Sequence, residues 1–139
     1  MTIDEAIKAI ATSEEFREFT YVFDDWWDVD QSVSRAKLPA IAHILPIGGV
    51  MELRNGRLYD REQVAIAFFD KVPRDASGED QQKVFERMKD AAIRFVRAAN
   101  ASGHFSQVEL RNYSVIYNQL ASIVTGVMLT MEFEGNGTC

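Results

Sequence analysis

The residues best suited to chemistry lie in one short acidic segment, FDDWWDVDQS, over residues 23–32. Hard cations such as Mg²⁺ and Ca²⁺ prefer oxygen ligands, so its carboxylates could hold a metal ion. Two carboxylates beside tryptophan rings could instead be the acid and the base of a glycosidase. The aspartates and the adjacent tryptophans of this segment are Asp24, Asp25, Asp28, Asp30, Trp26 and Trp27.

Neither chemistry fits the segment well. An EF-hand loop needs a central glycine and a distal glutamate, which this spacing lacks. A glycosidase normally has a long cleft, and so short a chain has little length left to build one. We therefore interpret the segment as an acidic surface loop.

The paired tryptophans are more informative than the aspartates. Two consecutive residues of a strand-like segment point to opposite faces, so one ring can join the core while the other needs a cover. Large exposed aromatics are enriched at protein–protein contacts. The predicted interface residues are Trp26, Trp27, Asp24, Asp25 and Asp28.

Other chemically capable residues are few: one cysteine, Cys139, and two histidines, His43 and His104. The sequence has no glycine-rich phosphate loop, no GxSxG elbow and no HExxH motif. This set is too small for a zinc site. We expect His43 to be a partly buried or edge residue that is hydrogen-bonded to the backbone, and His104 to cap a helix end. The prediction is a protein that is not an enzyme, with no catalytic residues, cofactor or metal ion.

The composition limits the possible partners. The 139 residues carry a formal net charge of −6, and their number favours one domain, residues 1–139. An acidic chain lacks the excess of Lys and Arg that neutralises phosphates, so we expect no nucleic-acid recognition and no attraction to anionic membranes. No apolar run approaches the ~20 residues of a membrane helix. The early acidic residues do not resemble a signal peptide, and the single cysteine favours the cytoplasm.

The elements needed to position these residues can be read along the chain. Thr2 and Glu5 have the spacing of a capping box before a helix that should end within residues 13–16. Alternating aromatics predict a strand over residues 19–23, just before the acidic segment.

A hairpin should follow. Pro39 and Pro46 are the expected limits of one strand, because proline cannot donate to the ladder of a central strand. Asn55-Gly56 predicts a type I′ turn, since both residues accept a positive φ. The next strand is apolar on both faces and should be central and covered on both sides. Its two faces are Val64, Ile66 and Phe68 on one side and Ala65, Ala67 and Phe69 on the other.

The C-terminal half predicts a long helix and two strands. Ser77 and Asp80 have capping-box spacing, and an amphipathic pattern continues to about Ala99. Strand patterns follow over residues 106–120 and 124–135, with the tail from about residue 134 expected to fray. The predicted class is α+β: a mainly antiparallel sheet of four to six strands packed against two helices that cover its apolar faces, in the order α-β-β-β-α-β-β.

Several of these segments, in this order, resemble the tail terminator proteins of long-tailed bacteriophages, also called tail-completion or minor tail proteins, the family that includes the phage lambda tail terminator. The resemblance covers nearly the whole chain, and the LPAIA stretch is its sharpest element. The matching segments are IDEAIKAI, FTYVFDDWWDVD, LPAIA, GGVMELRNGRLYDREQVAIAFFD, KVPRDASGED and VTGVMLTMEF.

The resemblance implies a non-enzymatic structural protein. Such proteins form a ring, typically a hexamer, that caps the finished tail tube and presents a surface to the head. The implied partners are other copies of the chain, the tail tube protein and head–tail connector proteins. The implied locations are the host cytoplasm during assembly and then the virion tail. A net negative charge suits such a ring, because DNA must pass through without sticking.

Two other functions remain open from the sequence. The same fold could be a non-enzymatic adaptor or protein-binding module. Alternatively, the acidic residues Asp24, Asp25, Asp28 and Asp30 could serve a metal-dependent hydrolase.

Overall fold

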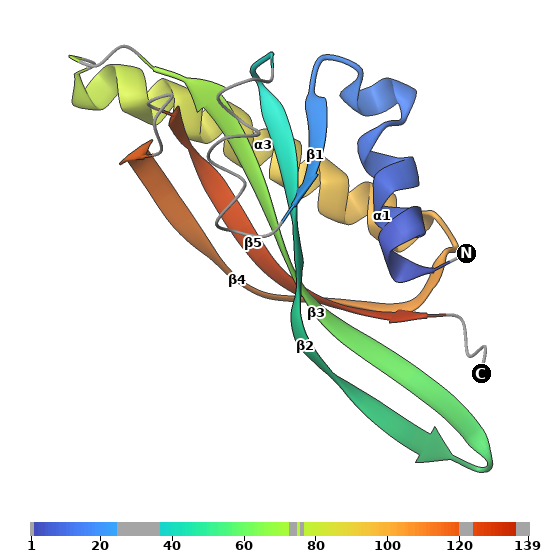
Figure 1. The fold of residues 1–139 in the computed structure, drawn as a ribbon. Helices are drawn as coiled ribbons and strands as arrows, with labels where there is room; N and C mark the ends of the chain where they lie inside the picture. The colour runs from blue at the N-terminus through green and yellow to red at the C-terminus, as the bar shows by residue number, and fades with distance from the viewer. Residues whose placement is uncertain (1, 25–36, 73–74, 76, 120–123, 136–139) are drawn as a thin grey trace.

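The computed structural model describes residues 2–24, 37–72, 75, 77–119 and 124–135. Within these ranges five strands form one sheet in the order β1-β2-β3-β5-β4, with two α-helices beside it (Figure 1). Among the five described strands, only β1 and β2 pair in parallel, and the other neighbours are antiparallel. The predicted α+β class is therefore confirmed. The elements are α1 (Ile3–Ala11), the short 3₁₀ helix η1 (Glu14–Phe16), β1 (Thr20–Asp24), β2 (Ala40–Arg54), β3 (Arg57–Lys71), α3 (Gly78–Ala101), β4 (Phe105–Gln119) and β5 (Val124–Gly135).

Both α-helices begin where the capping patterns predict. The hydroxyl of Thr2 accepts a hydrogen bond from the backbone N–H of Glu5 at 3.1 Å. Ser77 caps α3 in the same way, accepting from the N–H of Asp80 at 3.1 Å. Each bond satisfies one of the amides that a helix start leaves without an intrahelical partner.

The hairpin between β2 and β3 turns at the predicted dipeptide. Asn55 has φ 51° and Gly56 has φ 79°, the two positive values that a type I′ turn requires. The prediction that Pro46 limits the strand is wrong, because β2 continues through it to Arg54. The pairing register shifts between Ile44 and Gly48, and a proline can be accommodated at such a bulge.

Both helices pack on the same face of the sheet, which corrects the expectation that they would cover its apolar faces. The aromatic centre of this layer joins three elements: the ring centroids of Phe68 and Phe95 are 5.8 Å apart, and those of Phe16 and Phe95 are 6.0 Å apart. A smaller buried cluster lies on the other face of the sheet, formed by Ala42, Ile44, Ala67, Phe69 and Val124.

The centre of the sheet confirms the predicted alternation along β3. Phe68 belongs to the helix-side core, and Phe69 belongs to the cluster on the other face. Opposite Phe69 lies Gly126 of β5. A Cβ at this glycine would overlap the carbonyl oxygen of Phe68 and lie 3.0 Å from the Cα of Phe69. Only glycine therefore permits this close approach of β3 and β5.

β5 continues to Gly135, past the residue near which the predicted frayed tail should begin, and residues 136–139 of that tail lie outside the described residues. Glu134 is buried within the strand, and its carboxylate accepts hydrogen bonds from Arg61 at 3.1 Å and from Arg54 at 3.2 Å. These contacts attach the end of β5 to both strands of the β2–β3 hairpin.

Candidate interaction surfaces

The acidic segment is described only at its start. Asp24 is the last residue of β1, an edge strand, and it lies opposite Ile44 of β2. Trp26, Trp27, Asp25 and Asp28, with Asp30, lie outside the described residues, so their interface role stays a prediction. Among the described residues, no group of three or more His, Cys, Asp or Glu side chains could hold a metal ion.

His43 lies in the interior between α1 and the sheet, more deeply than predicted. Its side chain is 0% exposed. Nδ1 lies 3.1 Å from the hydroxyl of Tyr21 on β1, a side chain rather than the backbone partner expected. The ring of Phe23 stacks on the imidazole with centroids 4.5 Å apart. On the other side, Nε2 is 3.7 Å from Oδ1 of Asp4, which is too long for a direct hydrogen bond.

The electrostatics of this cluster follow from burial. Desolvation lowers the pKa of His43 to about 4, so the ring is neutral at physiological pH. Burial raises the pKa of Asp4, and burial together with the Asp4 charge raises the pKa of Tyr21 to about 12. A histidine with so low a pKa is a weak base at neutral pH. We interpret the group as a buried polar cluster in which the Tyr21–His43 hydrogen bond links β1 to β2, with the carboxylate of Asp4 on α1 beside it.

A projecting hairpin arm is the most conspicuous surface feature. We define the arm as residues 48–63, the part of the β2–β3 hairpin beyond the register shift (Figure 1). Met51 and Leu53 are each 71% exposed, and Leu58 is also exposed. Leu53 pairs directly with Leu58, and Met51 pairs with Asp60, so these four side chains share one face of the arm. Val50 is exposed on the opposite face.

An apolar groove lies between α3 and the sheet at the edge strand β4. Its volume is about 270 Å³, and most of its wall is aliphatic or aromatic. Leu110, Tyr113 and Ile93 are exposed here. Two cations stand beside this apolar surface, Lys89 and Arg97. Lys89 donates to the hydroxyl of Tyr113 at 3.4 Å and lies 5.0 Å from the centre of its ring. We call this surface, together with its two cations, the edge groove.

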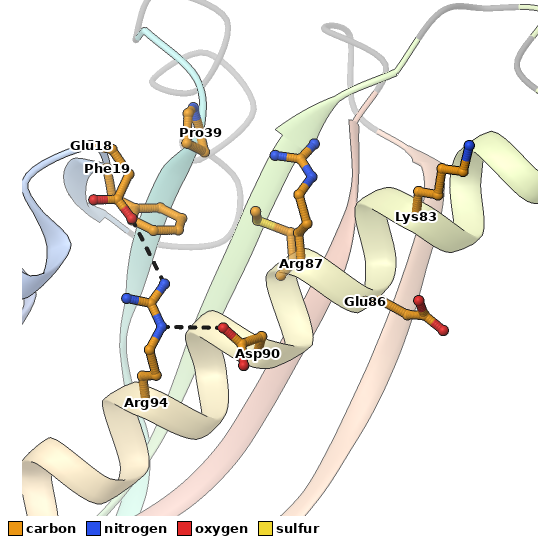
Figure 2. A pocket seen from close by; sticks show the side chains of 9 residues that line it. Glu18, Phe19, Pro39, Lys83, Glu86, Arg87, Asp90 and Arg94 are labelled. Atoms are coloured by element: carbon orange, nitrogen blue, oxygen red, sulfur yellow. Dashed lines mark ion pairs between the residues drawn. The ribbon is translucent and has the colours of Figure 1, made fainter.

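A wider hollow of about 690 Å³ lies between the start of β1 and α3 (Figure 2). Arg94 reaches both Asp90, at 3.3 Å, and Glu18, at 3.7 Å. Arg87 pairs with Asp70 of β3 at 2.9 Å. Because both guanidinium groups are already held by carboxylates, an anionic ligand would have to break these pairs. The hollow therefore offers a weaker case for binding than the edge groove.

Comparison with known proteins adds no relative. Neither protein-family models nor curated proteins give a match to this chain. Among the described residues, no helix is long and apolar enough to cross a membrane.

The arm and the edge groove are the surfaces that sequence reasoning missed. The Asn-Gly turn was a signal for the hairpin, and the alternation of apolar residues around it was visible. That alternation is typical of a half-buried strand, however, and only the tertiary structure shows that nothing in the described parts of the chain covers Met51 and Leu53.

Proposed function

We propose that this chain is a structural protein of a phage or prophage tail, a tail terminator whose copies form a ring that caps the tail tube and joins it to the head. The order of sequence segments, with LPAIA as the sharpest, supports this assignment. The observation that carries it is the arm, where Met51, Leu53 and Leu58 are exposed together on one face, because contiguous exposed apolar side chains mark surfaces that contact other proteins.

The charge of the protein agrees with this role. With a formal net charge of −6, the chain repels phosphates, so DNA can pass through a ring of such subunits without being retained. The binding energy for assembly would then come from apolar contacts between subunits rather than from nucleic acid.

The test is binding to isolated tail tubes from the phage or prophage that encodes the chain. We expect electron micrographs to show the protein at one end of finished tubes, and native mass spectrometry to show a discrete ring, a hexamer by the resemblance. A protein that binds no tube end, even at high concentration, would contradict the proposal.

An adaptor or protein-binding module is the second candidate, and the edge groove favours it. An adaptor would engage one partner without forming a closed ring. Leu110→Asp in the groove should then abolish binding of that partner and leave the mass of the free protein unchanged.

A further inference from the structure

We propose that the arm of one copy docks into the edge groove of the next copy, so that the chain assembles head to tail. This inference deepens the proposed function, and rests on it, because it names the contact that would build the ring. The two surfaces differ and lie on different parts of the same chain. The arm projects past the end of β5 (Figure 1), and the groove lies between α3 and β4. A contact between two different patches of identical subunits generates rings or filaments rather than closed dimers.

The arm cannot fill the groove of its own chain. Its strands are continuous with β2 and β3, which are held in the sheet by their pairing with β1 and β5. The edge groove lies at the other side of the sheet, beyond β5, where β4 is the last strand. Folding the arm back would break the register that joins it to the core.

The chemistry of the two surfaces is complementary. The arm presents Met51, Leu53 and Leu58 as an apolar face, with the carboxylate of Asp60 beside them. The groove presents an apolar floor between two cations, Lys89 and Arg97. The whole arm has no net charge, but its arginines, Arg54, Arg57 and Arg61, lie on the opposite face, and the apolar face carries only the carboxylates of Asp60 and Glu62. The cationic rim of the groove is complementary to this acidic, apolar face. A second copy of the chain supplies that face.

The first test is complementation between two defective variants. Leu53→Arg places a charge on the apolar face of the arm, and Leu110→Asp places a charge in the apolar groove. Both side chains are more than half exposed, so neither change should prevent folding. We expect each variant alone to lose at least tenfold in self-association by sedimentation or native mass spectrometry, which corresponds to about 1.4 kcal/mol. Their equimolar mixture should form a heterodimer, because the unmodified arm of the Leu110→Asp variant can bind the unmodified groove of the Leu53→Arg variant. The heterodimer should not assemble further, because its remaining arm and groove both carry a substitution. A mixture that stays monomeric would overturn the proposal.

The matched control is Val50→Arg. It adds the same charge to the arm at a residue of similar exposure, but on the opposite face. Assembly should match that of the unmodified protein, with circular dichroism used to check that every variant is folded. If Val50→Arg and Leu53→Arg weaken assembly equally, the effect is one of charge alone and the arm–groove contact is refuted.

The second test traps the contact covalently. In a Cys139→Ser background, Leu53→Cys with Leu110→Cys should give a ladder of disulfide-linked oligomers under mild oxidation, and Val50→Cys with Leu110→Cys should not. Absence of the ladder refutes the contact. If rings form and Leu53→Arg leaves them intact, the arm–groove contact is refuted, but the proposed ring-forming function is not. If the ladder of disulfide-linked oligomers forms but the protein binds no tail tube, the arm–groove contact is supported and the proposed tail function is refuted.

Discussion

The buried imidazole of His43 makes the stability of this protein depend on pH. Acidification favours the unfolded chain, because the unfolded histidine binds a proton near its ordinary pKa of 6.5 and the folded one only near pH 4. The contribution is fully present above pH 6.5 and is lost as the pH falls from 6.5 toward 4. At about 1.36 kcal/mol for each unit of pKa, the loss reaches about 2 kcal/mol at pH 5 and about 3 kcal/mol at pH 4.

Two neighbouring carboxyl groups act in the opposite direction. The pKa values of Asp4 and Glu62 are raised in the folded protein, mainly by burial, so their protonation on acidification favours the fold. Asp4 would also attract a protonated His43 at 3.7 Å, but desolvation of the ring outweighs this attraction in lowering its pKa. The slope of the unmodified protein alone therefore underestimates the effect of the histidine, and a comparison with a variant is needed.

The assay is urea denaturation at several pH values between 7.5 and 4.5 for the unmodified protein and for His43→Leu. The variant lacks the titrating ring, so the unfolding free energy of the unmodified protein should fall by about 2 kcal/mol relative to that of the variant between pH 7.5 and pH 5. His104→Gln is the matched control, because His104 is the other histidine of the chain and is exposed. If His43→Leu keeps the pH slope of the unmodified protein, or His104→Gln removes it, the reasoning is refuted.

Four further results are expected. Gly126→Ala should lower the unfolding free energy by at least about 3 kcal/mol in the same urea assay, because the new Cβ would overlap the backbone of β3. The control is Gly48→Ala, which has open space around the new Cβ and should change the unfolding free energy by less than about 1 kcal/mol. Glu134→Ala should cost about 1–3 kcal/mol by leaving two arginines without their shared carboxylate, which thermal denaturation would reveal as a lower Tm. Replacing Trp26 and Trp27 by alanine should weaken oligomers seen by light scattering, and unchanged oligomers would remove these residues from the interface. Calorimetric titration with Mg²⁺, Mn²⁺ or Ca²⁺ should give no binding heat, and measurable binding would revive the hydrolase alternative.

Much of the fold could be predicted because its signals are local. The helix starts depend on Thr2 and Ser77, whose hydroxyls bond amides three residues away. The hairpin turn depends on two residues that tolerate a positive φ, and both have it. The two faces of β3 follow from strict alternation over six residues, ending with Phe68 and Phe69. Each of these features is decided within a few positions of the chain.

The features that sequence reasoning missed depend on tertiary contacts. Whether Pro46 ends a strand or lies within a bulge depends on how β3 pairs beside it. The choice of one face for both helices depends on the packing of Phe16 and Phe95 around Phe68. The depth of His43 depends on α1 crossing over it and on Phe23 stacking against it. None of these tertiary contacts can be predicted from a short sequence pattern.

The candidate interfaces divide in the same way. The composition around Trp26 and Trp27 suggested a contact surface, and most of that segment lies outside the described residues. The arm and the edge groove join residues that are distant in sequence, such as Ile93 with Leu110, or become notable only through exposure, as with Met51. Exposure is a property of the whole fold, so no sequence pattern could have marked these residues as a surface.

The sheet order also bears on when the protein can fold during synthesis. β5 follows every other described element in the chain, yet it lies between β3 and β4 in the sheet. Until the ribosome releases Val124–Gly135, β3 has an unpaired edge, and β4 has no described strand beside it. The β2–β3 hairpin can close early across its two-residue turn, but the described sheet is completed only after β5 has emerged. The nascent protein therefore exposes a long apolar strand edge from the completion of β3 until β5 emerges, and a chain that stops before β5 would leave that edge available for aggregation.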